Sequence, residues 1–358
     1  MDVPKISVVI TAFRSGELIK EAIESVLAQT FGNFEIIIVD NNASEETKTA
    51  YTKLVNSNPG KIRVVHENVQ GACSARNRGI REAKGVYIAL LDDDDTMYPD
   101  RLFKQFIAME NNPKGTMAYG GLNIISFDGK KIIEKNKYWD AQYWVTILFG
   151  DSLRFQSDPL SLPPPSVFFF RKEVVDKIGL FDERFNPIMV EDTEFLLRMW
   201  EAGQFIKINE PLINYRLASQ DFANQKRSGN TNFLKVQKNL NLFYSILIEK
   251  YFDPSDKKNI NKFKKIQSQW LRELSLELFE FKDGKSLGRK TILRAIKCEP
   301  LSIKNWKWYA RSFMPGYLYK KVFNVKDNAY YLLKNIEGIE NVDSFFITPN
   351  KVKIESLS

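Results

Sequence analysis

The first half of the chain alternates short apolar runs with helical patterns, and this alternation limits the folds that it can adopt. Strands are predicted where branched apolar residues run together, at residues 6–11, 34–39, 62–66 and 86–91. Between them, apolar residues recur at helical spacing in residues 15–30 and 71–84. Strands that alternate with helices are typical of βαβ units. The sequence therefore predicts an α/β fold with a mainly parallel, Rossmann-like sheet flanked by helices.

The rest of the chain is expected to complete this domain and then to change character. A hairpin is predicted at 117–133, a strand at 167–171, a helix from Glu191 to near Gly203, and strands at 205–208 and 212–215. Lys-rich amphipathic helices then follow at 232–252, 261–281, 288–298 and 303–313. We therefore expect two domains, residues 1–216 and a mainly helical region at 217–358.

Charge is distributed unevenly between these two regions. The chain of 358 residues carries a net charge of +8, but residues 217–358 hold 26 Lys and Arg against 14 Asp and Glu. Residues 1–216 hold 26 Lys and Arg against 30 Asp and Glu. A basic helical region can bind an anionic membrane surface or a polyanionic acceptor, while nucleic acid is a less favoured partner. A merely solvated helical surface is the alternative that the sequence leaves open.

Several features favour a cytoplasmic protein. No apolar run approaches the roughly 20 residues of a membrane-spanning helix, and the first residues do not resemble a signal peptide. The two cysteines, Cys73 and Cys298, lie too far apart in sequence to suggest a disulfide framework. We expect a cytoplasmic location, with a peripheral position on the inner membrane face if the basic helices bind lipid.

Four consecutive carboxylates, Asp92 to Asp95, follow the strand predicted at 86–91. Adjacent like charges repel unless water or a cation screens them, so this cluster suggests a divalent-metal site. Because His66 is the chain's one histidine, the metal would use oxygen ligands, which favours Mn2+ or Mg2+. Asp40 also follows a predicted strand, and ligands of parallel sheets bind at the carboxyl ends of strands. Phosphate chemistry in a shared cleft is the expectation.

An ordered set of motifs carries a family resemblance. The motifs are ISVVITAF at 6–13, IVDNN at 38–42, SARNRGI at 74–80, LDDDD at 91–95 and ED at 191–192. Together they resemble the family 2 glycosyltransferases over about residues 5–216. The resemblance implies a GT-A fold and the inverting transfer of a sugar from a nucleotide donor to an acceptor.

The resemblance also implies a role for each matching residue. Asp192 would be the catalytic general base, and Asp94 a direct metal ligand, with Asp92 near the metal or the ribose. Asp40 would accept a hydrogen bond from a uracil imide, and Arg76 would lie near the base or the diphosphate. The remaining residues expected to bind substrate are Thr11, Phe13, Asp93 and Glu191.

The chain departs from the family pattern at two places. Asn42 stands where many relatives have Gly, which is tolerable because Asn also adopts left-handed conformations. Relatives commonly carry a metal-binding His shortly after a Tyr-Arg pair, but here Tyr215-Arg216 is followed by Leu217. The set of ligands that would complete the metal coordination is therefore in doubt.

Structural roles for some of these residues remain open. Asp40 could instead cap the helix expected near residues 44–55. Glu191 and Asp192 could be present only because acidic side chains in the first turn of a helix interact favourably with its dipole. Arg76 could lie on the protein surface together with Arg78.

The function expected from these observations is transfer of a hexosyl or N-acetylhexosaminyl group from a UDP-sugar. The acceptor would be a hydroxyl of a glycan, lipid-linked or polyanionic molecule in cell-surface polysaccharide synthesis. Two alternatives remain open, a non-catalytic adaptor that binds nucleotide sugar or polysaccharide, and a sugar nucleotidyltransferase.

Overall fold

The computed structural model describes residues 3–139, 163–186, 190–217 and 284–313, together with single positions between 239 and 279. The contacts within the chain divide it into two compact units, Met1–Gln220 and Asp221–Ser358.

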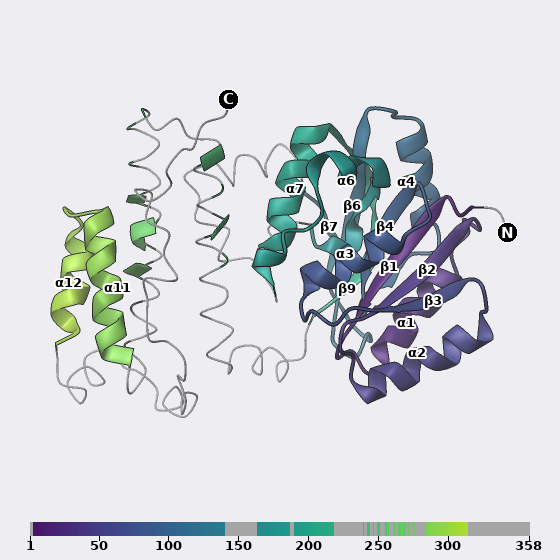
Figure 1. Ribbon diagram of the computed structural model, residues 1–358, viewed down its shortest axis with the longest axis horizontal. Helices are drawn as coiled ribbons and strands as arrows, with labels where there is room; N and C mark the ends of the chain where they lie inside the picture. The colour runs from purple at the N-terminus through teal and green to yellow at the C-terminus, as the bar shows by residue number, and fades with distance from the viewer. Residues whose placement is uncertain are drawn as a thin grey trace. The chain divides into compact units, whose positions relative to one another are not determined.

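Four parallel strands form one half of the sheet in the first unit, in the order β3-β2-β1-β4 (Figure 1). Their bounds are β1 Ile6–Ala12, β2 Phe34–Asp40, β3 Ile62–His66 and β4 Tyr87–Asp92. The strands predicted from the apolar runs are confirmed to within one residue at each end. The connecting helices are α1 Leu18–Leu27, α2 Glu45–Ser57 and α3 Ala72–Glu82.

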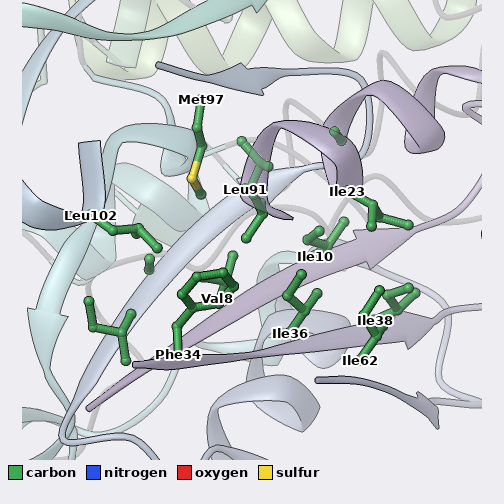
Figure 2. Packing of buried hydrophobic residues seen from close by; sticks show 14 of the residues in the cluster. Val8, Ile10, Ile23, Phe34, Ile36, Ile38, Ile62, Leu91, Met97 and Leu102 are labelled. Carbon is green, nitrogen blue, oxygen red and sulfur yellow. The ribbon is translucent and has the colours of Figure 1, made fainter. Parts of the chain in front are cut away.

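Helices cover both faces of the central strands, which explains why β1, β2 and β4 are buried along nearly their whole length rather than on alternate residues. On one face, Val8 and Ile10 of β1 share a buried cluster with Ile23 of α1 (Figure 2). On the other face, Val9 contacts α3 at Gly79, where an added Cβ would lie 2.2 Å from the Val9 Cγ1 atom. The close approach of α3 to the sheet therefore requires a residue without a side chain.

The second half of the sheet mixes parallel and antiparallel strands. It contains β5 Thr96–Met97, β6 Gly115–Ile125, β7 Ile132–Lys137, β8 Phe169–Arg171 and β9 Gln204–Arg216. The predicted hairpin is confirmed, because β6 pairs antiparallel with β7 and the intervening turn contains Gly129 with a φ of 71°. The expected α/β fold with its sheet flanked by helices is confirmed.

One prediction in this region is wrong. The two short strands expected at 205–208 and 212–215 form a single strand, β9, which runs parallel to β6. The segment around Pro211 looks like a turn in sequence, but Gly120 pairs with Ile208 and the next residue, Gly121, pairs with Pro211. A bulge in β9 absorbs the extra residues, so pairing with β6 continues past them.

Three further helices complete the described part of the first unit: α4 Arg101–Glu110, α6 Lys172–Ile178 and α7 Glu191–Ala202. The last of these ends at Gly203 as expected. The strand expected at 167–171 is shorter than predicted, because a 3-10 turn at Pro165–Val167 precedes β8. A second 3-10 turn lies at Glu183–Phe185.

The second unit contains the helix pair α11 Gly284–Cys298 and α12 Ile303–Arg311. Their separation at Glu299-Pro300 agrees with the sequence-based expectation. A buried cluster that includes Ile292 and Ala295 of α11 packs against Trp308 and Tyr309 of α12. The helices expected at 232–252 and 261–281 lie largely outside the described residues.

No helix in the part of the chain that the structure describes is both long enough and apolar enough to cross a membrane.

Candidate active site

The carboxyl ends of three neighbouring strands bring predicted site residues to one edge of the sheet. In the register of the parallel strands, Ala12 pairs with Asp40 and Thr11 pairs with Asp92. Since adjacent strands lie about 4.8 Å apart, Asp40 and Asp92 are two strand spacings apart, or about 10 Å. A nucleoside diphosphate could extend over this distance along the edge where parallel sheets bind ligands.

Arg76 of α3 joins the end of β4 to the start of α7. Its guanidinium donates one hydrogen bond to Asp92 Oδ1 at 3.1 Å and another to Glu191 Oε1 at 3.0 Å. Arg76 is buried, and its guanidinium lies 5.5 Å from the centre of the Phe181 ring. Burial alone would lower the pKa of Arg76, but the charges of Asp92 and Glu191 outweigh it and raise the pKa. The arginine is therefore a fixed positive charge between two carboxylates.

Asp192 lies in the first turn of α7, next to this ion-pair network. Its Oδ1 atom accepts a hydrogen bond from the Thr193 backbone N–H at 2.6 Å. Burial, followed by the nearby charge of Glu191, raises the pKa of Asp192 to about 7, and Arg76 opposes this rise. A carboxyl group with a pKa near neutrality is suited to general base catalysis.

Two members of the aspartate run hold neighbouring segments in place. The Asp93 carboxylate accepts a hydrogen bond from the Phe13 backbone N–H at 2.9 Å. Burial, followed by the charge of Asp94, raises the pKa of Asp93 to about 7. Asp95 is buried and accepts a hydrogen bond from the Arg216 backbone N–H at 2.8 Å. Asp93 thus fixes the loop after β1, and Asp95 fixes the end of β9.

Asp40 is buried and already holds the turn that follows β2. One carboxylate oxygen accepts from the Ala43 backbone N–H at 2.8 Å, and the other from the Tyr51 hydroxyl at 3.0 Å. The side chain that caps α2 belongs to Ser44, which accepts from the Thr47 backbone N–H. The alternative in which Asp40 caps this helix is therefore wrong. A carboxylate offers about four lone-pair sites, so capacity remains for a ligand donor.

The loop after β2 also positions the helix that carries Arg76. Asn41 Oδ1 accepts a hydrogen bond from the backbone N–H of Gly71, the residue before α3, at 2.8 Å. Asn42 has a φ of 58°, so the expectation that asparagine replaces glycine in a left-handed conformation here is confirmed.

Two other residues of α3 have structural roles. Arg78 forms an exposed ion pair with Glu82 at 3.0 Å, so only Arg76 of the two arginines joins the network. The side-chain amide of Asn77 donates a hydrogen bond to the Phe181 carbonyl and accepts one from the Phe181 backbone N–H, both at 2.9 Å. These bonds hold the turn at 179–183 against α3.

Tyr215 is a candidate site residue that the sequence-based reasoning missed. Burial raises the pKa of its hydroxyl, and so do the charges of Asp95, Asp92, Asp94 and Asp192, in that order. The phenol therefore lies within electrostatic reach of both the aspartate run and the expected base. The Tyr215-Arg216 pair is the feature of the sequence that points to Tyr215, although by itself it indicates only where a downstream histidine would be expected.

Arg216 holds Tyr215 and the aspartate run together. Its Nε atom donates to the Asp94 carbonyl at 2.8 Å, and its Nη2 atom donates to Glu21 Oε2 at 2.6 Å. The side chain is buried. The end of β9, the aspartate run and α1 are thus joined at one residue.

The carboxylates of Asp92 and Asp94 suit a divalent cation that is also bound by substrate oxygens better than a cation bound by protein side chains alone. Among the residues that the structure describes, no group of three or more His, Cys, Asp or Glu side chains is arranged to hold a metal ion. Asp92 and Asp94 supply hard oxygen donors, and Mg2+ commonly binds one or two carboxylates together with substrate phosphates and water.

The parallel strands in the order β3-β2-β1-β4, with carboxylates and a buried arginine at their carboxyl ends, agree with the GT-A fold expected from the sequence. Residues 7–179 match the family described as glycosyl transferase family 2. The chain belongs to this family.

Curated relatives agree with this assignment. An uncharacterized glycosyltransferase of Nostoc sp., alr2836, is 31% identical over 237 residues, which are 65% of this chain and 67% of the relative. The succinoglycan biosynthesis protein ExoO of Rhizobium meliloti is 33% identical over 130 residues, 36% of each chain. The chain spans between 18% and 66% of the length of four Rickettsia relatives.

A solved structure supports the fold. The crystal structure of S. aureus TarS 1–349 in complex with UDP matches with a TM-score of 0.50 and 16% identity, and the match covers 86% of this chain and 91% of that chain. At this level of identity the likeness concerns the fold alone.

Proposed function

We propose that this glycosyltransferase moves a hexosyl or N-acetylhexosaminyl group from a UDP-sugar to an acceptor hydroxyl with inversion at the anomeric carbon. The observation that carries the proposal is the placement of Asp192. Burial raises the pKa of its carboxyl group to about 7. Asp192 follows Glu191, and Arg76 joins Glu191 to Asp92 at the carboxyl end of β4. One side chain, Arg76, would thereby connect the proposed base to the proposed donor site.

In the proposed reaction, Asp192 accepts the proton of the acceptor hydroxyl as its oxygen attacks the anomeric carbon. A bond forms between that oxygen and the sugar, and the bond from the sugar to the diphosphate oxygen breaks. The nucleoside diphosphate leaves with the electron pair, and the proton stays on Asp192. Attack on the face opposite the leaving group gives inversion.

Donor binding is assigned to the sheet edge. Asp40 would accept the uracil imide N–H, with Thr11 and the Phe13 loop beside it, and Asp92 and Asp94 would hold Mn2+ or Mg2+ against the diphosphate. When bound, such a cation neutralises charge on the leaving group. In support of a uridine donor, the TarS structures that share this fold contain UDP in one case and UDP-GlcNAc in another.

The acceptor is proposed to be a glycan, a lipid-linked glycan or another polyanionic molecule of cell-surface polysaccharide synthesis. Support comes from ExoO, whose name places it in succinoglycan biosynthesis, and from the basic residues of 217–358. These residues would associate with the acceptor or with an anionic membrane on its cytoplasmic side.

The decisive experiment is a turnover screen of UDP-, GDP- and dTDP-sugars with Mn2+, followed by the Asp192→Asn variant on the best donor. We expect a UDP-sugar to be used and the variant to lose about 10²–10⁴-fold in kcat, the usual contribution of a general base. UDP binding, measured by calorimetry, should persist in the variant. Asp176→Asn on the exposed side of α6 is the matched control and should keep full activity.

Turnover by Asp192→Asn at the wild-type rate would reject the base assignment. Preference for a guanosine or thymidine donor would reject the role given to Asp40. A product that retains the anomeric configuration would contradict the proposed direct displacement.

A further inference from the structure

The tip of the α11–α12 hairpin carries three large apolar side chains that are exposed or half exposed in the part of the chain that the structure describes. Leu301 is 94% exposed, Ile303 is 70% exposed and Trp306 is 49% exposed. The indole N–H of Trp306 donates to the Pro300 carbonyl at 2.8 Å. This bond holds the ring against the turn, so the three side chains are gathered at one end of the hairpin. We call this group, with its turn at 299–302, the hairpin tip.

The exposure of the hairpin tip follows from how α12 packs. Its inner face carries Trp308 and Tyr309, which pack on the cluster that contains Ile292. Asn305 is buried and donates to the Ser268 hydroxyl at 2.7 Å. Figure 1 shows α11 and α12 side by side. With this face fixed, residues 303 and 306, one turn apart, are directed away from the hairpin core.

Positive charge surrounds these apolar side chains. Lys297 in the last turn of α11, and Lys304 and Lys307 in α12, are all exposed. Glu299 is the one acidic residue in the segment 297–307, and its carboxylate accepts a hydrogen bond from the Ser268 hydroxyl. The hairpin tip therefore presents apolar side chains with exposed basic ones nearby in the sequence.

We propose that the hairpin tip docks on an anionic lipid surface, with Leu301, Ile303 and Trp306 at the boundary of headgroups and acyl chains. Tryptophan favours this boundary because its ring is apolar and its N–H polar. Basic side chains at the rim are attracted to acidic headgroups. A soluble acidic partner would match the lysines but would leave Leu301 and Ile303 in water. The inference rests on the membrane association proposed above and identifies the residues that produce it.

The test is co-sedimentation of the full chain with vesicles of phosphatidylcholine, with and without phosphatidylglycerol, at low and high salt. We expect binding to the anionic vesicles that weakens at high salt. Leu301→Ser combined with Trp306→Ser should weaken it by roughly a hundredfold, since burying each side chain is worth at least about tenfold. Lys304→Ser combined with Lys307→Ser should weaken it by roughly fivefold per lysine.

Two matched controls separate the hairpin tip from general surface properties. Lys290→Ser removes an exposed lysine of α11 away from the tip, and Phe103→Ser removes a half-exposed aromatic ring from α4. Both should bind vesicles like the wild type. Trp306 fluorescence gives a second readout: brominated lipid should quench the emission of the wild type more than that of Trp306→Phe. This measurement does not depend on the serine variants folding.

Equal binding to neutral vesicles, no binding to anionic ones, or equal losses in the controls would overturn the inference. So would a tip variant that changes the oligomeric state in sedimentation velocity without vesicles, because a second copy would then cover the tip. Turnover of a soluble donor and acceptor should be unaffected by the tip variants. A failure of sugar transfer and a failure of lipid docking are therefore distinguishable.

Discussion

Asp192 is a single carboxyl group whose protonation should set the pH dependence of the enzyme. Because burial raises its pKa to about 7, the group is protonated, and unable to accept a proton, below that pH. We expect kcat/KM to rise with pH through about 7 and then level off. A pH–rate profile checks this, and a profile that is flat through neutrality would contradict the role of base.

The same shift predicts a change in stability. The folded protein retains a proton on Asp192 above the ordinary value of 3.8, where the unfolded chain has released it. Stability from this group is therefore present at acid pH and is lost as the pH rises toward 7. Asp192→Asn should raise the melting temperature at pH 8 relative to wild type, but not at pH 4, in scanning calorimetry. A constant difference at both pH values would show that ionisation is not the cause.

Arg76 should affect both stability and the base. Arg76→Met leaves Asp92 and Glu191 without their counter-charge, so we expect the free energy of unfolding to fall by about 3–5 kcal/mol. Since Arg76 opposes the raised pKa of Asp192, the midpoint of the pH–rate profile should also move upward. Arg78→Met, on the same helix but in an exposed ion pair, should cost at most about 1 kcal/mol. Equal effects of the two variants in urea unfolding and pH–rate measurements would refute this assignment.

At the level of secondary-structure elements, the contact of α3 with the sheet makes a sharp prediction. The Cβ of Gly79→Ala would overlap Val9, and relief of such overpacking costs about 1–3 kcal/mol. Gly32→Ala is the control, because no atom lies within 4 Å of its added Cβ, and it should change stability by less than about 0.5 kcal/mol. Urea unfolding of both variants measures the difference. A Gly79→Ala variant as stable as the control would mean that α3 can move away without cost.

The elements also show where local sequence is sufficient. The strands β1 to β4 were predicted closely because each contains a short run rich in β-branched apolar residues, a local pattern typical of strands. The strand β9 was divided wrongly, since Pro211 and its neighbours have the composition of a turn. Pairing with β6 overrides that composition, and no local pattern reports which strand will lie alongside.

For the molecule as a whole, the division into two units places the proposed donor site and the proposed lipid-binding hairpin tip in different units. All residues proposed to bind the donor or the cation lie in Met1–Gln220, which is one compact unit. Expressed alone, residues 1–220 should unfold cooperatively and bind UDP with Mn2+ as tightly as the full chain does. UDP should in turn strengthen Mn2+ binding, because two carboxylates need diphosphate oxygens to complete the shell. Calorimetry measures both, and a folded fragment that fails to bind UDP would contradict this view.

The printed sequence was enough to predict the α/β sheet, its first four strands and the carboxylates at their ends, because apolar periodicity and strand-end position are local properties. The connection of Asp92 to Glu191 through Arg76 was not predictable. The hydrogen bonds by which Asp93 fixes Phe13 and Asp95 fixes the end of β9 were not predictable either. These contacts join residues that are distant along the chain, and the packing of α3, α7 and β9 around one sheet edge brings them within hydrogen-bonding distance.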